Sequence, residues 1–185
     1  MKKSMLSLGI MLLSVGILGG CAAQSKSSSN DSQQVSLANN LAVSLEDAVA
    51  IYQKTYPQTD ITSIELEKSL NKKIYRIEGV DDNKEYQINL NANNKKIIHQ
   101  RTEKLDADEQ NGEKRSDKVS LTDLLSIQKI AKIAERELSH GKATEFSLEQ
   151  ELGVTSWEVK VKSGMKEKEI KIDAQKGTVL RVETD

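Results

Sequence analysis

An internal repeat limits the fold of this 185-residue chain more than any other feature of its sequence. Apolar residues of one segment recur 82 positions later, without a gap, across strand-like segments and the turns between them. The matching pairs are Tyr75 and Trp157, Ile77 and Val159, Ile88 and Ile170, Leu90 and Ile172, Ala92 and Ala174, and Ile98 and Leu180. A gap-free match of this length is not expected by chance. We therefore predict two copies of one fold.

Each copy contains four segments in which apolar and polar residues alternate. They span residues 61–68, 73–80, 84–91 and 96–101 in the first copy and 143–150, 155–162, 167–174 and 177–183 in the second. A period of two predicts strands with one buried and one solvated face, as in an antiparallel sheet covered on a single side. A helical pattern precedes the strands of each copy. The predicted fold class is α+β, with two tandem repeats, each one helix packed on one face of a small antiparallel sheet.

Serine residues indicate where the two helices begin. Ser44 and Ser120 each precede an apolar helical pattern and are followed three residues later by an acid, which is typical of a helix N-terminus. The first helix must end near Tyr56 because Pro57 follows. These two serines are only 76 residues apart, so we expect the six extra residues to lengthen the second helix, with Gly141 capping its end.

Composition divides the rest of the chain. A segment rich in Ser, Gln and Asn predicts a flexible tether over residues 21–40. A densely charged segment predicts a linker over residues 102–118 between repeat one, residues 41–101, and repeat two, residues 119–185. Repeats of this size are marginally stable alone, so we expect the two to touch.

The N-terminus carries a secretory signal. A short basic start precedes an apolar run that is too short to span a membrane, which predicts a signal peptide over residues 1–20. The sequence Leu18-Gly19-Gly20-Cys21 resembles the lipobox of bacterial lipoprotein precursors, and Cys21 is the only cysteine. The resemblance implies cleavage before Cys21, an S-diacylglyceryl group on its thiol and an N-acyl group such as palmitate. The predicted location is the extracytoplasmic face of the cell membrane, with the protein anchored by lipid. An ordinary secretory signal with a chance cysteine is the alternative.

The end of each repeat carries a further motif. The second copy has Trp157-Glu158-Val159, followed by Asp173-Ala174-Gln175-Lys176-Gly177 and then Val179-Leu180. With the preceding helix and strands, this arrangement resembles the PepSY domain over about residues 41–100 and 119–183. The resemblance implies a non-catalytic module of the cell envelope, and a modulatory or inhibitory role towards peptidases. It provides no catalytic residues.

The first copy departs from this motif. Lys95 stands where the second copy has Gly177, and we expect the turn to use Asn93 or Asn94, which tolerate a left-handed backbone better than most residues.

The residues singled out by the motif have structural interpretations. We expect Trp157 and its counterpart Tyr75 to lie in the core or between the repeats. We expect Asp173 to hydrogen-bond the backbone of its own turn and Gly177 to shape that turn.

The sequence offers little catalytic chemistry. His99 and His140 have no histidine or cysteine partner at metal-ligand spacing, and no nucleotide-binding or hydrolase motif is present. The acidic residues Asp106, Asp108 and Glu109 lack the ordered spacing of a calcium loop. We therefore predict no enzyme activity, no metal site and no cofactor. A formal net charge of −1 argues against nucleic acid as a partner.

Three functions remain open. The first is a lipid-anchored, non-catalytic binding module for a protein or peptide in the envelope, including a peptidase, based on the exposed edge strand of an open sheet. The second is a structural or sensory accessory lipoprotein of an envelope or cell-wall complex. The third is a small-molecule or metal carrier, which requires an enclosed pocket.

Overall fold

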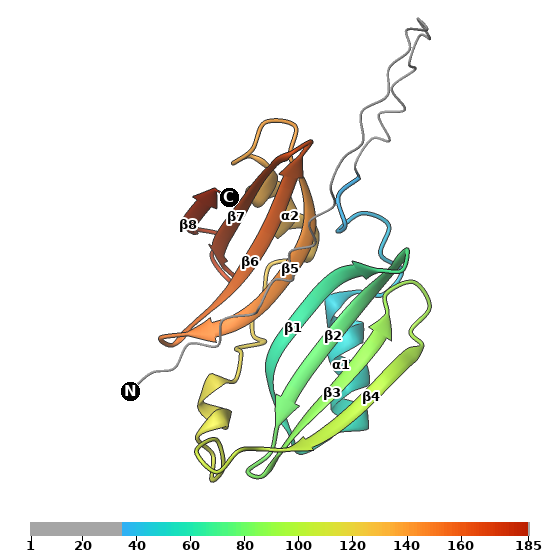
Figure 1. The fold of residues 1–185 in the computed structure, drawn as a ribbon, viewed down its shortest axis with the longest axis vertical. Helices are drawn as coiled ribbons and strands as arrows, with labels where there is room; N and C mark the ends of the chain where they lie inside the picture. The colour runs from blue at the N-terminus through green and yellow to red at the C-terminus, as the bar shows by residue number, and fades with distance from the viewer. Residues whose placement is uncertain (1–34, 185) are drawn as a thin grey trace, which may run out of the picture. The chain divides into compact units, whose positions relative to one another are not determined.

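The computed structural model describes residues 35–184 of the chain (Figure 1). The signal peptide, Cys21 and the first part of the predicted tether lie outside the described residues. The elements follow the order α1 (Leu45–Thr55), β1 (Asp60–Ser69), β2 (Lys72–Val80), β3 (Lys84–Asn91), β4 (Ile97–Lys104), the 3-10 helix η1 (Lys114–Asp117), α2 (Ile127–Glu135), β5 (Lys142–Glu151), β6 (Val154–Ser163), β7 (Lys166–Asp173) and β8 (Val179–Thr184). All eight predicted strands are present, with bounds that differ by three residues at most. No helix among these residues is long and apolar enough to cross a membrane.

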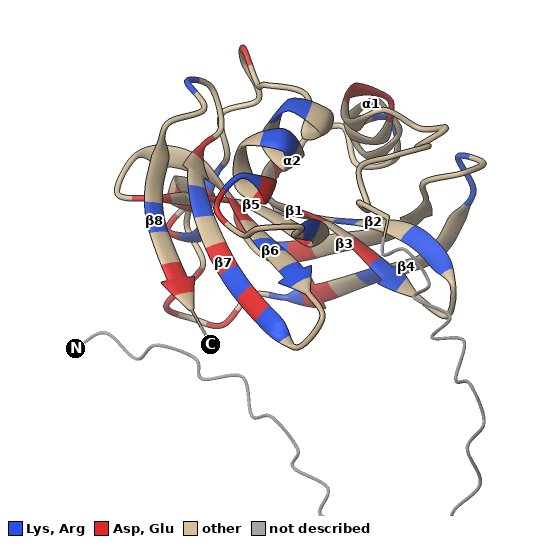
Figure 2. Ribbon diagram, turned by 90° about the horizontal axis from the view of Figure 1, so that it is seen from above, with Lys and Arg blue, Asp and Glu red and all other residues tan. Residues whose placement is uncertain are grey.

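The strands form one continuous antiparallel sheet in the order β4-β3-β2-β1-β5-β6-β7-β8. Both helices lie on the same face of this sheet (Figure 2). The fold class predicted from the sequence is therefore confirmed. The two repeats touch as expected, and they do so edge to edge, so that two four-stranded sheets become one sheet of eight.

The junction between the repeats has a local twofold symmetry. Strands β1 and β5 pair through three residues each, with Ile64 opposite Leu148, Glu65 opposite Ser147, and Leu66 opposite Phe146. Phe146 and Leu148 are the counterparts of Ile64 and Leu66 at the repeat distance of 82 residues. Each repeat thus presents the same strand to the other, as the two subunits of a symmetric dimer do.

One hydrophobic core runs under both repeats. Its fully buried members include Tyr52 and Tyr75 of the first repeat and Phe146 and Trp157 of the second. Helix α1 contributes Leu45, Ala48 and Tyr52, and α2 contributes Ile127, Ile130, Ala131 and Ala134. Because the strands alternate, the same face of every strand supplies the remaining core.

The second helix differs from the prediction. It begins at Ile127 and is capped by Ser126, whose hydroxyl accepts a hydrogen bond from the N–H of Lys129; Ser120 is not its N-cap. Ser126 lies 82 residues after Ser44, the observed cap of α1. The repeat distance therefore holds from the helix onward and no residues are inserted. Ser120 instead donates its backbone N–H to the hydroxyl of Thr155, outside the helix.

The end of the second helix was also predicted incorrectly. Helix α2 ends at Glu135, well before Gly141, and the left-handed residue that precedes β5 is His140, with a φ of 59°. Gly141 has a packing role, because a Cβ at this position would lie 2.5 Å from Cγ1 of Val161. A side chain there would therefore collide with β6.

Parts of the predicted tether and of the predicted charged linker are packed onto the fold. In the last part of the predicted tether, Ser36, Leu37 and Ala38 are buried, and the N–H of Leu37 donates to the carbonyl of Ala143 at 2.8 Å. The tether prediction was wrong for these residues, because two of them are apolar and find a place in the core. They anchor the chain before the first repeat begins.

The predicted linker is also ordered against the fold. Strand β4 continues to Lys104, Leu105 is buried, and Arg115 forms ion pairs with Asp60 at 2.7 Å and Asp82 at 2.8 Å. The side-chain amide of Gln150, in the second repeat, donates to the carbonyl of Ser116 at 3.0 Å. The charge of Arg115 therefore fastens the segment to the first repeat, and a neutral hydrogen bond joins it to the second.

Candidate functional site

The two ends of the sheet expose backbone hydrogen-bonding groups. Among residues 35–184, strands β4 and β8 each have a single neighbour, β3 and β7 respectively, and almost all of their residues are exposed. An edge strand with free N–H and C=O groups can accept another extended segment by main-chain pairing. The open edges required by the binding-module hypothesis are therefore present.

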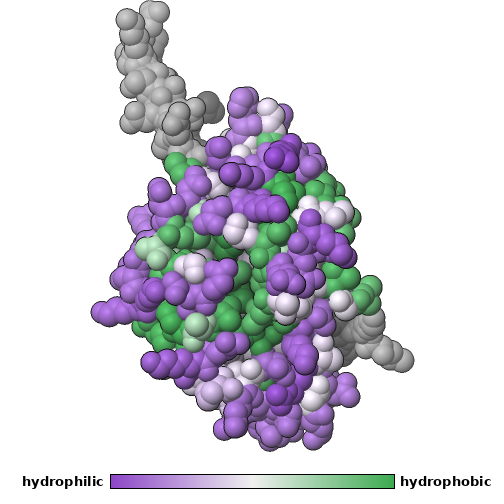
Figure 3. Space-filling model, turned by 180° about the vertical axis from the view of Figure 1, so that it is seen from behind, coloured by the Kyte–Doolittle hydropathy of each residue, from purple (hydrophilic) through white to green (hydrophobic). Residues whose placement is uncertain are grey.

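The edge formed by β8 carries exposed apolar side chains. Val182 lies opposite the buried Ile170 and therefore on the helix face of the sheet, where it remains 38% exposed. Leu180 lies at an irregularity in the pairing of β7 with β8 and is 48% exposed. Seen from the helix side, Figure 3 shows apolar surface reaching solvent between polar side chains. This edge thus offers both backbone groups and apolar area to a partner.

The edge formed by β4 is more polar. Gln100 occupies the position of Val182 and lies opposite Ile88, and Ile98 corresponds to Leu180. Each edge strand carries one ion pair of its own, Arg101 with Glu103 on β4 and Arg181 with Glu183 on β8, so the edges differ at Gln100 and Val182. Charged and polar side chains on an edge strand disfavour pairing with another chain. The two edges therefore have different chemistry although they share one backbone arrangement.

The face of the sheet away from the helices is charged and internally paired. Arg76 joins Glu65 at 2.6 Å and Glu67 at 2.9 Å, and Lys162 joins Glu167 at 2.8 Å. Figure 2 shows acidic and basic residues interspersed along β6 and β7. Oppositely charged side chains on neighbouring strands contribute modestly to sheet stability. Their mutual pairing gives this face a mixed charge and no single-sign patch.

Glu169 on this face has an unusual acidity. A hydrogen bond with the carboxyl group of Glu158, followed by partial burial and the charge of the same neighbour, raises the pKa of Glu169 to about 7. Two carboxyl groups that are joined by a hydrogen bond share a proton more readily than they carry two charges.

The aromatic residues singled out by the motif are buried in the core. Trp157 packs edge-to-face on Phe146, with ring centroids 6.1 Å apart, and neither ring is exposed. Tyr75 is also fully buried, and its hydroxyl donates to the carbonyl of Val43 at 3.2 Å. These rings hold the helices against the sheet and present no surface to a ligand.

Asp173 and Gly177 lie in the turn between β7 and β8. The Oδ1 atom of Asp173 accepts hydrogen bonds from the backbone N–H groups of Lys176 at 2.8 Å and Gln175 at 3.0 Å. The first of these bonds is the main reason that the pKa of Asp173 is lowered. Gly177 has a φ of 75°, in the left-handed region that favours glycine.

The corresponding turn of the first repeat does not use the expected residue. Lys95 itself adopts the left-handed conformation, with a φ of 60°, and neither Asn93 nor Asn94 has a positive φ. The backbone of the turn is thus conserved between the repeats, and the lysine accepts the strain that glycine avoids. Its ammonium group forms an ion pair with Asp47 at 2.9 Å.

The histidines and the acidic linker residues form no site in the described part of the chain. His99 lies exposed on β4 and His140 lies exposed in the turn before β5. Among residues 35–184, no group of three or more His, Cys, Asp or Glu side chains is arranged to hold a metal ion.

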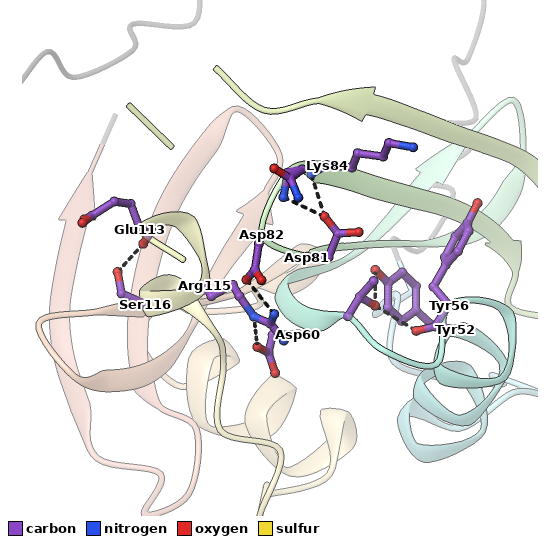
Figure 4. Close-up of polar contacts among 11 residues, drawn as sticks. Tyr52, Tyr56, Asp60, Asp81, Asp82, Lys84, Glu113, Arg115 and Ser116 are labelled. Carbon is purple, nitrogen blue, oxygen red and sulfur yellow. Dashed lines mark hydrogen bonds and ion pairs between the residues drawn. The ribbon is translucent and has the colours of Figure 1, made fainter. Parts of the chain in front are cut away.

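The first repeat contains a cleft that was not predicted from the sequence. It has a volume of about 520 Å³ and lies between the end of α1, the turn from β2 to β3, and η1 (Figure 4). Tyr56 and Tyr86 line it, with ring centroids 4.7 Å apart, and Tyr52 packs on Tyr56 at 5.6 Å. A comparison of the two repeats could have indicated it, because the second repeat has no aromatic residue at any of these three positions.

Comparisons with known proteins agree with the fold. The profile of the PepSY family, described as the peptidase propeptide and YPEB domain, matches residues 42–101 and 124–183, two segments at the repeat distance of 82. The crystal structure of a candidate lipoprotein from Clostridium difficile 630 superposes with a TM-score of 0.77 at 38% sequence identity, covering 80% of this chain and 97% of that one. No curated protein matches the sequence significantly. On the strength of the two matched segments and the shared fold, the chain belongs to the PepSY family.

Proposed function

We propose that this protein is a lipid-anchored, non-catalytic binding module on the extracytoplasmic face of the cell membrane, which takes an extended segment of a partner protein onto strand β8. The lipobox-like sequence that ends at Cys21 supports the anchor, as does the resemblance of the fold to a candidate lipoprotein. The PepSY family, whose description names peptidase propeptides, supports an accessory role without catalysis.

The observation that carries the proposal is the open, partly apolar edge of β8. An added strand would pair with its free backbone groups and cover Val182 on the helix face. The partner segment is expected to alternate apolar and polar residues, because alternate side chains of an added strand point to the two faces of the sheet. Main-chain pairing gives affinity, and the exposed apolar side chains give preference for one register.

A peptidase of the cell envelope is the partner that the family description favours. In this proposal an extended segment of the peptidase pairs with β8, and the module modulates or inhibits its activity by holding that segment. A structural or sensory accessory lipoprotein would use the same edge towards a component of a wall or transport complex, so the identity of the captured partner separates the two.

The test is in-cell photo-crosslinking of the lipidated protein, with a photoreactive residue at Arg181 on β8. We expect capture of a specific envelope protein, and we expect Val182→Lys to abolish this capture because a lysine on the helix face opposes strand addition. Gln100→Lys is the matched control, since it places the same charge at the same register of β4 and should leave capture intact. Equal capture by the wild type and by Val182→Lys would refute the β8 site.

The captured protein then decides the role. A secreted or membrane-bound peptidase supports modulation, and its activity should change when the purified mature protein is added and remain unchanged when the Val182→Lys variant is added. Capture of wall-synthesis or transport components supports the accessory role and argues against a peptidase.

A further inference from the structure

We propose that the cleft lined by Tyr56 and Tyr86 is a second binding site, independent of the β8 edge, and that it takes an organic cation, namely an ammonium or guanidinium group such as that of a lysine or arginine side chain. The cleft lies in the first repeat, at the end of α1, and is open to solvent (Figure 4).

Aromatic residues are concentrated at this cleft. The whole chain contains four tyrosines, one phenylalanine and one tryptophan. Three of these six residues, Tyr52, Tyr56 and Tyr86, are in mutual contact here, and Tyr56 and Tyr86 are only partly buried. Tyr56 and Tyr86 line the cleft and Tyr52 is buried beneath them, so half of the aromatic rings of a chain with few of them lie in or directly under one open cleft.

The second repeat shows that the fold does not supply this reason. It has the same elements at the same spacing, yet Ala134, Leu138 and Lys168 occupy the positions of Tyr52, Tyr56 and Tyr86. The ammonium group of Lys168 donates to the carbonyl of Glu137, the counterpart of Thr55, at 2.8 Å. In the second repeat, Lys168 thus lies where Tyr86 lines the cleft in the first repeat.

The packing beneath the cleft is adapted to the tyrosines. A Cβ on Gly79 would lie 2.5 Å from the hydroxyl of Tyr52, so only glycine leaves room for that ring. The second repeat reverses this arrangement, with the larger Val161 at the position of Gly79 and the smaller Ala134 at the position of Tyr52. The hydroxyl of Tyr52 also accepts a hydrogen bond from Thr59 at 3.2 Å, which fixes the ring at the base of the cleft.

The electrostatics of the cleft favour a positive ligand. Asp81, Asp82 and Arg115 line it, and Arg115 is held between Asp82 and Asp60, which lies just outside the lining (Figure 4). Arg115 keeps its own charge, because the hydrogen bonds with Asp82 and Asp60 raise its pKa. Two carboxyl groups and one guanidinium in the lining leave a net charge of −1, and Asp60 shares the charge of Arg115 from outside it.

Asp81 and Tyr86 act together. The Tyr86 hydroxyl donates to Oδ2 of Asp81 at 2.7 Å, and the backbone N–H groups of Asn83 and Lys84 donate to Oδ1 at 2.8 Å. Partial burial raises the pKa of Asp81, but these three bonds outweigh it and the pKa is lowered, while the same contact raises the pKa of Tyr86 to about 12. The carboxylate is therefore ionised and the phenol neutral at physiological pH. A phenol that donates to a carboxylate has a more electron-rich ring, and electron-rich ring faces attract cations.

The dimensions of the cleft fit a side-chain-sized group. Its volume of about 520 Å³ lies in the range of small-ligand pockets. Thr55, Gln58 and Thr59 line the remaining wall and supply oxygen acceptors for the N–H groups of a cation. Asp82 is exposed on the turn and completes the site with a charged acceptor.

The test is an NMR titration of the mature chain from residue 21, with Cys21→Ser to keep it free of lipid. The probes are Nα-acetyl-lysine N-methylamide and Nα-acetyl-arginine N-methylamide, which keep their charged side chains, a short lysine-containing peptide, and the same peptide with norleucine in place of lysine. We expect saturable shifts of the Tyr56, Tyr86 and Asp82 signals with the cationic probes and none with the norleucine peptide. If the lysine peptide binds more tightly than the single-residue lysine methylamide, the ligand is a lysine or arginine side chain of a polypeptide. If the two bind equally, the ligand is a small organic amine.

Two exchanges with the second repeat give variants that the fold already accommodates. Tyr86→Lys places a fixed cation in the cleft and should weaken binding at least tenfold, and Tyr56→Leu removes one ring and should weaken it several-fold. Val182→Lys is the control, because it adds the same charge in β8, which is separated from β3 by five strands and lies at the opposite end of the sheet, and should leave the affinity for the cationic probes unchanged. Dispersed amides and buried Trp157 fluorescence confirm that each variant is folded.

Three results would overturn the inference. They are equal binding of the norleucine and lysine peptides, unchanged affinity of the Tyr86→Lys variant, and shifts of the same signals by an N-acetylglucosamine oligomer in place of the cations. None of them bears on the β8 edge, whose own test uses Val182→Lys and partner capture, so the two proposals can fail separately.

Discussion

The continuous sheet predicts that the two repeats unfold as one unit, and the single tryptophan makes this testable. Trp157 lies fully buried in β6, so its fluorescence reports the second repeat. Ile88 lies fully buried in β3 of the first repeat, and strands β2, β1 and β5 separate it from β6. If the repeats fold cooperatively, a cavity at Ile88 must shift the unfolding transition that Trp157 reports.

The expected shift follows from the burial of the side chain. Replacing a fully buried isoleucine by alanine lowers the free energy of unfolding by about 2–5 kcal/mol, because apolar contacts are lost and a cavity is left. With an m-value of about 2 kcal/mol/M in urea, the midpoint falls by about 1–2.5 M. Ile170 provides the matched control, because it is the counterpart of Ile88 in β7 and is equally buried.

The assay is equilibrium urea unfolding of wild type, Ile88→Ala and Ile170→Ala, followed by Trp157 fluorescence and by far-ultraviolet circular dichroism. We expect the transitions followed by the two probes to coincide, and the urea concentration at the midpoint to fall by a similar amount in the two variants. The reasoning is refuted if Ile88→Ala leaves the fluorescence midpoint unchanged while circular dichroism shows a separate earlier phase. In that case the three residue pairs between β1 and β5 would be too weak to couple the repeats.

The remaining predictions concern a turn, a carboxyl group and the anchor. Gly177→Lys should lower the free energy of unfolding in urea by about 2 kcal/mol, because the φ of Gly177 is 75° and a Cβ there would lie 2.9 Å from Ile133 Cδ1. Lys95→Gly should leave the free energy of unfolding unchanged or raise it by up to about 1 kcal/mol, because glycine adopts the left-handed conformation without strain. The pKa of Glu169 is raised from 4.5 to about 7 in the folded protein, so the folded state holds its proton longer than the unfolded state and stability falls as pH rises through that interval. Glu169→Gln should remove this loss, so its urea midpoint relative to wild type should be higher at pH 8 than at pH 4.5. Cys21→Ser should release the protein from the membrane fraction and abolish labelling by a fatty-acid analogue, as expected of a lipid anchor on that thiol.

The strands could be predicted because burial on one face of a sheet imposes a period of two on the sequence. That period survives in Tyr86, Ile88 and Leu90 as clearly as in Trp157 and Val159, and the observed strand bounds follow it closely. The pairing of β1 with β5 was not predictable from this signal. An edge strand that meets another repeat and one that meets solvent have the same alternation, since the pairing uses backbone groups.

The predicted start of α2 was wrong because two serines, Ser120 and Ser126, lie where a helix N-cap could be expected. Ser120 is followed by Leu121 and an acid at position 123, which resembles the start of α1, while Ser126 lacks an acid in the first turn. The fold chooses Ser126 because the residue before it, Leu125, donates its N–H to the carbonyl of Ala174, as Val43 does to Ala92 in the first repeat. That tertiary constraint outweighs the local capping signal, and no local pattern encodes it.

The cleft escaped prediction for a related reason. Tyr52 and Tyr56 lie on α1, Tyr86 lies thirty residues further on, and Arg115 comes from a segment that charge alone assigns to solvent. Tyrosines on the apolar face of a helix or strand usually indicate core, and Tyr52 is indeed buried. A comparison of equivalent positions in the two repeats is what separates these tyrosines from residues that the fold needs, because the second repeat forms the same fold without them.

Those same differences place the two proposed sites in different repeats. The apolar edge depends on Val182, where the first repeat has Gln100, and the cation site depends on Tyr86, where the second repeat has Lys168. Strands β8 and β3 belong to opposite halves of the sheet, and both sites are formed by side chains at its margins and not by the shared core. Occupying one site therefore changes no contact of the other, and we expect the affinity for a cationic probe to be the same with and without a strand bound at β8. Titration of the crosslinked complex with Nα-acetyl-lysine N-methylamide measures this directly, and a change of more than about threefold would mean that the sheet transmits binding from one repeat to the other.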